Sequence, residues 1–315
     1  MMRCWFAGII PAIGFASLLG AQSVHAADSL LQAGELQRAE GIYYAAVRAR
    51  PHDPIARWAL GRYLVSRGAP RVGATLFEES LKFGGEPSIV GPDLVAADLT
   101  IGNYTALSTL PSATAAERAR AKWIAARSPR TIAPESLIVA QFQRSNESSV
   151  IGHIPIRVNG RTIDAVVSAE VHGIVIADTV TVARTLHTFG VPRGKASRDP
   201  ELAAADSVAI ARLTMIAVPV LIDHIDRRQA ATIGLDVLAQ FAPTFDPVAG
   251  RLVLRPGGVV TNVGGERFAT LTTPTDIKIA RAGGWASLTQ SSIARMLHER
   301  RWTFDARRGE LVVTP

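Results

Sequence analysis

The stretch Ile154-Pro155-Ile156-Arg157-Val158-Asn159-Gly160-Arg161, followed by the apolar run 163–167, indicates how the second half of this chain folds. Asn159-Gly160 is a strong signal for a two-residue hairpin turn, because both residues tolerate positive φ. Further apolar runs of strand length, separated by turn residues, lie at 138–140, 174–176, 208–213, 218–222 and 252–254. We therefore expect a mainly β domain, with helices over 180–189 and 235–240.

Several landmarks in this region follow one another in the order found in retropepsin-type aspartic proteases, which the stretch 152–256 resembles. After Asn159-Gly160 come the segment Ile233-Gly234, the acid Asp236 and the hairpin start at Asp246. The resemblance implies that Ile233-Gly234 packs beneath a catalytic loop, and that both aspartates have structural roles. Asp246 is also a typical turn former ahead of 247–250. The segment 190–205 stands where the family carries its flap.

The catalytic tripeptide of that family, Asp-Thr-Gly or Asp-Ser-Gly, occurs nowhere in this chain. Counted from Asn159-Gly160, its place is taken by Ser168, Ala169 and Glu170. In such proteases two carboxylates share one proton and activate a water, since like charges about 3 Å apart cannot both ionise. A serine cannot replace that carboxylate, so we expect no catalytic residues here. Glu170 is the first alternative acid, although an exposed turn glutamate is the simpler interpretation, and Asp164 and Asp178 are reserves.

The end of the chain repeats the layout of 244–256. Residues 303–315 carry Thr, Phe, Asp, Gly, Leu, Val and Pro at the same offsets. A helix expected over 291–299 precedes the second copy, as 235–240 precedes the first. We interpret 257–315 as a candidate shortened second lobe, which also lacks the tripeptide and would complete the fold within one chain.

The N-terminal part shows a different period. Gly34, Gly68 and Gly102 are each 34 residues apart, the period of tetratricopeptide repeats, which this region resembles. The best-preserved copy predicts paired helices over 54–66 and 70–82, a weaker third copy starts near Pro92, and a last helix covers about 115–123. The resemblance implies a concave face that docks a peptide or a partner helix, while a spacer or a dimerisation surface is the alternative.

The first 26 residues have the pattern of a secretory signal, with Arg3, an apolar run and small residues before Ala26. Cleavage after Ala26 would remove Cys4, the single cysteine, so disulfides and thiol chemistry are not expected. No other apolar stretch approaches the roughly 18 residues of a membrane span. We therefore expect an exported, periplasmic α+β protein. Its expected parts are the signal peptide 1–26, the helical domain 27–127, the linker 128–136, the β domain 137–256 and the candidate second lobe.

Charge and histidine spacing exclude several classes of function. The net charge of +7 comes from scattered basic residues without interleaved aromatics, so a nucleic-acid platform is not expected. The histidines show no ligand spacing, so neither a metal nor another cofactor is expected. Ser168 and His172 are close in sequence, but no nucleophile-elbow pattern surrounds them.

The expected function is binding or scaffolding by a catalytically inactive, aspartic-protease-like domain. Its expected partner is a protein or an extended peptide in the periplasm, held by strand addition, and dimerisation is left open. The alternative is an aspartic-type peptidase that uses a non-standard acid such as Glu170. A third interpretation is an assembly part of an envelope complex.

Overall fold

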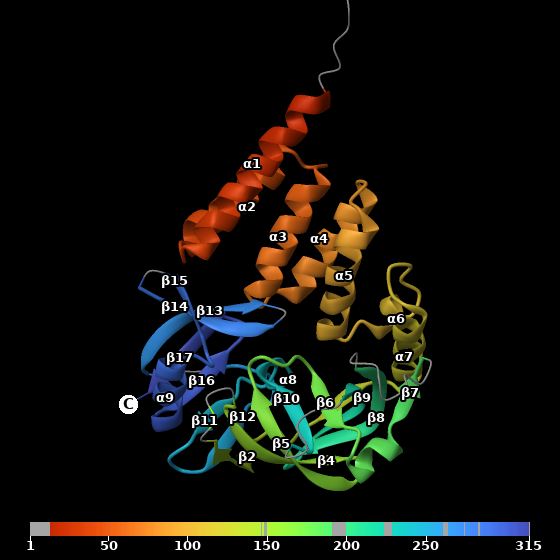
Figure 1. Cartoon of the computed structure of the whole chain (residues 1–315), viewed down its shortest axis with the longest axis vertical. Helices are drawn as coiled ribbons and strands as arrows, with labels where there is room; N and C mark the ends of the chain where they lie inside the picture. Colours follow the sequence, from red (N-terminus) through yellow and green to blue (C-terminus); the bar gives the residue numbers. More distant parts are fainter. Residues whose placement is uncertain are drawn as a thin grey trace, which may run out of the picture.

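The chain folds into N-terminal helices that stand on a larger β region (Figure 1). The structure is a computed structural model and describes residues 13–145, 147, 150–190, 200–223, 229–260, 264–273, 275–282 and 284–314. The expected α+β class is confirmed. No helix in these residues is both long and apolar enough to cross a membrane.

The helical part is a series of antiparallel pairs. Its helices are α1 (Ile13–Gln32), α2 (Leu36–Ala49), α3 (Pro54–Ser66), α4 (Pro70–Lys82), α5 (Pro87–Ile101), α6 (Tyr104–Leu107) and α7 (Ala115–Ala125). The helices predicted over 54–66, 70–82 and near 115–123 are confirmed as α3, α4 and α7. The expected start of the third copy at Pro92 is wrong, because α5 begins at Pro87 and Pro92 lies inside it.

Each of the three regularly spaced glycines follows the first helix of a pair. Gly34, Gly68 and Gly102 have φ of 81°, 84° and 72°, a left-handed conformation that glycine adopts at little cost. Gly68 has a second role, since a Cβ there would lie 1.9 Å from the carbonyl oxygen of Ala306. The repeated turn thus also allows α3 to approach the β region.

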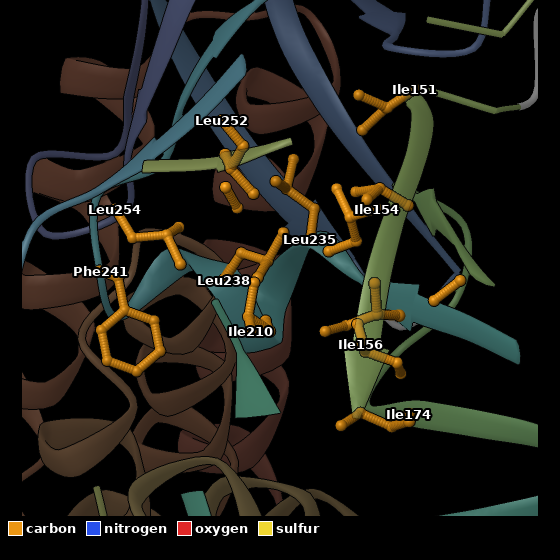
Figure 2. Packing of buried hydrophobic residues seen from close by; sticks show 14 of the residues in the cluster. Ile151, Ile154, Ile156, Ile174, Ile210, Leu235, Leu238, Phe241, Leu252 and Leu254 are labelled. Carbon is orange, nitrogen blue, oxygen red and sulfur yellow. The ribbon is translucent and has the colours of Figure 1, made fainter. Parts of the chain in front are cut away.

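Six strands close into a barrel. They are β4 (Gly152–Val158), β5 (Arg161–Ser168), β6 (Ile174–Ala177), β8 (Glu201–Ile210), β9 (Leu213–Asp223) and β10 (Ala231–Gly234). The ring runs β9-β6-β10-β5-β4-β8 and returns to β9. Alternate side chains of β4, such as Ile154 and Ile156, point into the core shown in Figure 2. Three short strands flank the ring: β1 (Arg130–Ile132) beside β9, β3 (Gln143–Arg144) beside β4, and β7 (His187–Phe189) beside β8.

A second sheet joins the barrel to the end of the chain. Its strands are β2 (Ile138–Gln141), β11 (Thr244–Asp246), β12 (Arg251–Leu254), β13 (Glu266–Thr273), β14 (Asp276–Arg281), β15 (Gly284–Ser287), β16 (Arg301–Asp305) and β17 (Glu310–Thr314). The order β2-β12-β11-β16-β17-β13 forms what we call the shared sheet. Helix α8 (Leu235–Ala239) precedes β11, and helix α9 (Ser291–Glu299) precedes β16. The repeated sequences therefore fold as equivalent hairpins, β11–β12 and β16–β17, and they meet where β11 pairs with β16.

Three local expectations are wrong. The run 208–213 is not one strand, because a turn at Ala211 (φ 49°) separates β8 from β9. The helix expected over 180–189 is only a 3₁₀ turn (Thr181–Thr185), since β7 then pairs with β8. The expected linker 128–136 contains β1, whose backbone pairs with β9, so it is part of the sheet.

Two expected features fall partly outside the described residues. Of the expected flap at 190–205, residues 191–199 are not described and the last five belong to β8. Of the expected signal peptide, residues 1–12 are not described. Helix α1 runs through Ala26, and Ala27 is buried against α2 and α3.

The helical part contacts the β region at two places. Helices α6 and α7 share an apolar cluster with the barrel, in which Leu107 of α6 and Ile124 of α7 pack with Ala204 and Ala217. Near the other end of the array, the indole Nε1 of Trp285 donates to the carbonyl oxygen of Leu31 at 2.6 Å, and Arg67 of the α3–α4 turn donates to the backbone of β13. The helical array therefore contacts the β region through α7 at one end and through Leu31 and Arg67 toward the other.

Candidate functional site

The residues that replace the catalytic tripeptide lie where two parallel strands end. Strand β5 pairs in parallel with β10, and Ser168 stands opposite Gly234 in the register. Parallel strands direct their carboxyl ends to the same edge of a sheet. The loop 168–173, here called the barrel loop, therefore lies beside Gly234-Leu235-Asp236.

Ser168 and Ala169 are buried, while the side chain of Glu170 is exposed. The hydroxyl of Ser168 accepts a hydrogen bond from the backbone N–H of Glu170 at 3.1 Å. Serine hydroxyls commonly form such turns with the backbone two residues on. The buried position of the loop thus carries a turn-forming hydroxyl and no carboxylate.

Asp236 holds the far end of the barrel loop. Its two carboxylate oxygens each lie 3.1 Å from the backbone N–H of Gly173, which donates to them. Gly234 makes this approach sterically feasible, because a Cβ there would lie 2.1 Å from Asp236 Oδ1 and 2.3 Å from the carbonyl oxygen of Val171. Both residues therefore position the loop.

His172 connects the barrel loop to β13. Its Nε2 donates to the carbonyl oxygen of Thr273 at 2.8 Å, and its Nδ1 lies 3.5 Å from Asp236 Oδ2. Both partners are hydrogen-bond acceptors without a donor of their own. The imidazole therefore donates to both when each of its nitrogens carries a proton. The hydrogen bond with Asp236 is the main reason that the pKa of His172 is raised, and burial opposes it. The structure thus pairs His172 with Asp236 and Thr273, and Ser168 with its own turn, so these two residues do not form a nucleophile and base.

Sequence reasoning missed Asp276, which opens β14. Its Oδ1 accepts from the hydroxyl of Ser287 at 3.0 Å. Burial raises the pKa of Asp276, and the negative charge of Glu170 acts weakly in the same direction. Asp276 comes from the part of the chain expected to be the second lobe. No spacing signal could link it to Glu170, because the pairing of β13 with β14 brings it there.

The other predicted residues lie apart from this loop or build turns. Asp164 is 65% exposed at its side chain and pairs with His153 Nδ1 at 3.0 Å, on the hairpin β4–β5. That hairpin turns at Asn159 and Gly160, with φ of 47° and 82°. Asp178 follows β6. Asp246 accepts from the backbone N–H of Ala249 at 2.9 Å in the β11–β12 turn.

The described residues contain no group of three or more His, Cys, Asp or Glu side chains placed to hold a metal ion. His224 lies outside these residues.

Two open pockets border α9 at a distance from the Ser168 turn. One, of about 450 Å³, is lined by residues that include Arg281, Trp285 and Gln290. The other, of about 310 Å³, lies between β3 and α9. Neither of these two pockets is lined by residues of the barrel loop.

No protein-family model matches the chain, and no curated protein matches it. Among solved structures, the chain is similar to a retropepsin-like aspartic protease from Rickettsia conorii. The sequence identity is 16% and the TM-score 0.27, and the match covers 40% of this chain and 92% of that one. The function proposed below therefore rests on the geometry of the barrel loop and not on this similarity.

Proposed function

We propose that this chain is a periplasmic binding or scaffold protein, in which tetratricopeptide-like helices are joined to a catalytically inactive, aspartic-protease-like β region. The observation that carries the proposal is the barrel loop. At its buried position Ser168 forms a turn with the N–H of Glu170, and the nearest structural acid, Asp236, is occupied by Gly173 and His172. The position of the missing tripeptide therefore lacks the carboxylate that would be needed to form a pair and activate a water.

Strand addition is the binding mode that the β region favours. Strands β2 and β15 are the ends of one sheet path and β1 and β7 the ends of the other, while β3 pairs only with β4 among the described residues. Edge strands present unpaired N–H and C=O groups to an extended peptide. The outward side chain of Val139 on β2 is 57% exposed, so this edge also offers apolar contact.

The helical part offers a second surface. On α3, the indole of Trp58 donates to Asp93 of α5 at 2.7 Å, and the guanidinium of Arg62 lies over the same ring at 4.9 Å. Ile55 and Ile89, on the same two helices, are 45% and 48% exposed. Aromatic and arginine side chains dominate protein interfaces, so this surface supports partner binding better than a spacer role.

The test uses the chain expressed with its own N-terminal segment in a Gram-negative host. The periplasmic fraction is assayed for the protein, its N-terminus is sequenced, and the purified protein is incubated with periplasmic extract. Mass spectrometry then identifies retained proteins and any new peptide ends. We expect retained partners and no new ends. New ends that vanish in Glu170→Gln, but persist in the control Glu78→Gln on the exposed face of α4, would overturn the proposal.

A second candidate function, an aspartic-type peptidase, is favoured by one observation. Glu170 and Asp276 come from different parts of the β region; burial raises the pKa of Asp276, and the negative charge of Glu170 acts weakly in the same direction. Such a peptidase would need both carboxyls, so Asp276→Asn should abolish the same new ends as Glu170→Gln. If either variant alone leaves cleavage intact, this pair is not the catalytic one.

A further inference from the structure

The pocket between β3 and α9 is lined mainly by basic and hydroxyl side chains. Arg144 comes from β3, whereas Arg295 and His298 come from one face of α9. Ser145, Ser291, Ala294 and Glu299 complete the lining of this open volume of about 310 Å³. Two segments that are far apart in the sequence thus place two guanidinium groups around one space.

The two arginines are available to a ligand. Within the described part of the chain, neither Arg144 nor Arg295 forms an ion pair or a side-chain hydrogen bond, and both are exposed. Arg251, by contrast, donates to Asp246 at 3.1 Å. A guanidinium group binds a carboxylate through two parallel hydrogen bonds, so unpaired arginines on a pocket favour an anionic ligand.

His298 fixes the position of this cationic surface. Its Nε2 donates to the carbonyl oxygen of Val150 at 3.3 Å, which ties α9 to the segment before β4. Glu299 adds one negative charge at the rim. The two arginines and this glutamate together carry a net charge of +1, which suits a single carboxylate better than a phosphate dianion.

An extended strand can reach the pocket along β3. Both residues of β3 are exposed, and β3 pairs only with β4 in the described part of the sheet. Gly152 of β4 permits that pairing, because a Cβ there would lie 2.5 Å from the carbonyl oxygen of Gln143. Among the described residues, β3 therefore has one edge without a strand partner, and Arg144 on β3 lines the pocket.

We propose that the pocket formed by Arg144, Arg295 and His298 binds an acidic side chain of an extended peptide lying along β3. This inference rests on the proposed binding function and specifies its partner as an acidic, extended segment. The edge of β3 favours a peptide over a lipid as the ligand, since a lipid headgroup has no backbone that could pair with β3.

The test is a fluorescence anisotropy titration with a labelled peptide, Thr-Val-Glu-Val-Glu-Val-Thr, blocked at both ends so that only its side chains are acidic. A matched peptide carries Gln in place of Glu. We expect the acidic peptide to bind about tenfold more tightly at low salt, and the difference to shrink as salt rises. The double variant Arg144→Gln, Arg295→Gln should remove the preference. The control Arg71→Gln, Arg212→Gln lowers the net charge equally at two exposed sites elsewhere and should keep it.

Each contrary result is distinct. If the control pair loses the preference as well, the effect is one of overall charge and the site is wrong. If the wild type binds both peptides equally, or binds neither but still retains partners from periplasmic extract, the inference fails and the binding function stands. If no partner is retained either, the binding function fails. Binding to vesicles that contain phosphatidylglycerol is measured as well. If the protein binds these vesicles and neither peptide, and the binding needs Arg144 and Arg295, the ligand is a lipid headgroup and the proposal of a peptide ligand is wrong.

Discussion

The two hairpins of the shared sheet, β11–β12 and β16–β17, differ little, whereas the regions that precede them differ greatly. Both hairpins have a buried Phe and a Thr at the pairing of β11 with β16, and both place an Asp at the turn. Before β11 stands a closed ring of six strands, whereas the described residues between β12 and β16 form β13, β14, β15 and α9. The repeat is therefore confined to the part where the two copies pair directly, through Thr244 opposite Thr303 and Phe245 opposite Trp302.

The largest effect is expected at the aromatic contact between the hairpins. Phe245 and Trp302 are 0% and 1% exposed, and their rings stack at 4.3 Å. Trp302→Ala and Phe245→Ala should each lower the free energy of unfolding by about 3–5 kcal/mol, because each leaves a cavity in a packed core. Urea denaturation followed by circular dichroism and by tryptophan fluorescence measures this loss. Val248→Ala, at an 82% exposed position, is the control.

If the two copies form one unit, both variants unfold in a single transition at a lower urea concentration. Two separated transitions would show that the copies are independently stable and would break the comparison.

The turn aspartates of the two hairpins should differ in how much they contribute to the free energy of unfolding. Asp246 accepts from Arg251 Nε and Nη2 at 3.2 and 3.1 Å, while Asp305 lies 3.8 Å from Arg308 Nε. Asp246→Ala is expected to cost about 2–3 kcal/mol and Asp305→Ala about 1–2 kcal/mol, since hydrogen bonds to charged groups are the stronger ones. Chemical denaturation of the two variants side by side checks the order. Equal losses, or a greater loss at Asp305, would contradict it.

The contact between the barrel loop and β13 should weaken with rising pH. The pKa of His172 is raised above its ordinary value of 6.5, mainly by Asp236. Its contribution to stability is therefore complete below pH 6.5 and is lost as the pH rises through the folded-state pKa. At pH 5.5, His172→Gln should cost about 1 kcal/mol, a value reduced for a side chain that is about a third exposed.

The measurement is the unfolding free energy of wild type and His172→Gln at intervals from pH 5.5 to 8.5. The difference between them should shrink as the pH rises. A difference that stays constant or grows would mean that the neutral imidazole makes the contact.

The smallest effect is expected at the hydroxyl pair in the middle of the shared sheet. Thr244 Oγ1 and Thr303 Oγ1 lie 2.7 Å apart and are buried, and Thr244 also accepts from Arg255 Nη1 at 2.6 Å. Thr303→Val should cost about 0.5–1 kcal/mol, since Thr244 keeps one partner. Thr244→Val should cost more, because it also removes the hydroxyl that accepts the hydrogen bond from Arg255 Nη1. A double-mutant cycle measures the coupling energy between Thr244 and Thr303. A value near zero would show that this hydrogen bond does not stabilise the pairing of β11 with β16.

Local patterns predicted those elements whose signals lie within a few residues. Helices α3 and α4 were predicted with their bounds, because Asp53 caps the first and prolines open both. The bounds of α9 were also predicted. The helix expected over 180–189 failed because the pairing of β7 with β8 prevailed over local preference. The linker failed in the same way, since β1 pairs with β9, which lies far along the chain.

The sequence by itself determined that this chain has no Asp-Thr/Ser-Gly tripeptide, that glycines recur at Gly34, Gly68 and Gly102 with a constant spacing, and that residues 244–256 are repeated at 303–315. These are facts of composition and spacing, and they need no coordinates. Only the tertiary structure decided which side chains share a site. It paired His172 with Asp236 and Thr273, placed Asp276 near Glu170, and brought Arg144 and Arg295 around one pocket. Such pairings join segments that are distant in the sequence, and they depend on how those strands and helices pack together, which patterns within a few residues do not specify.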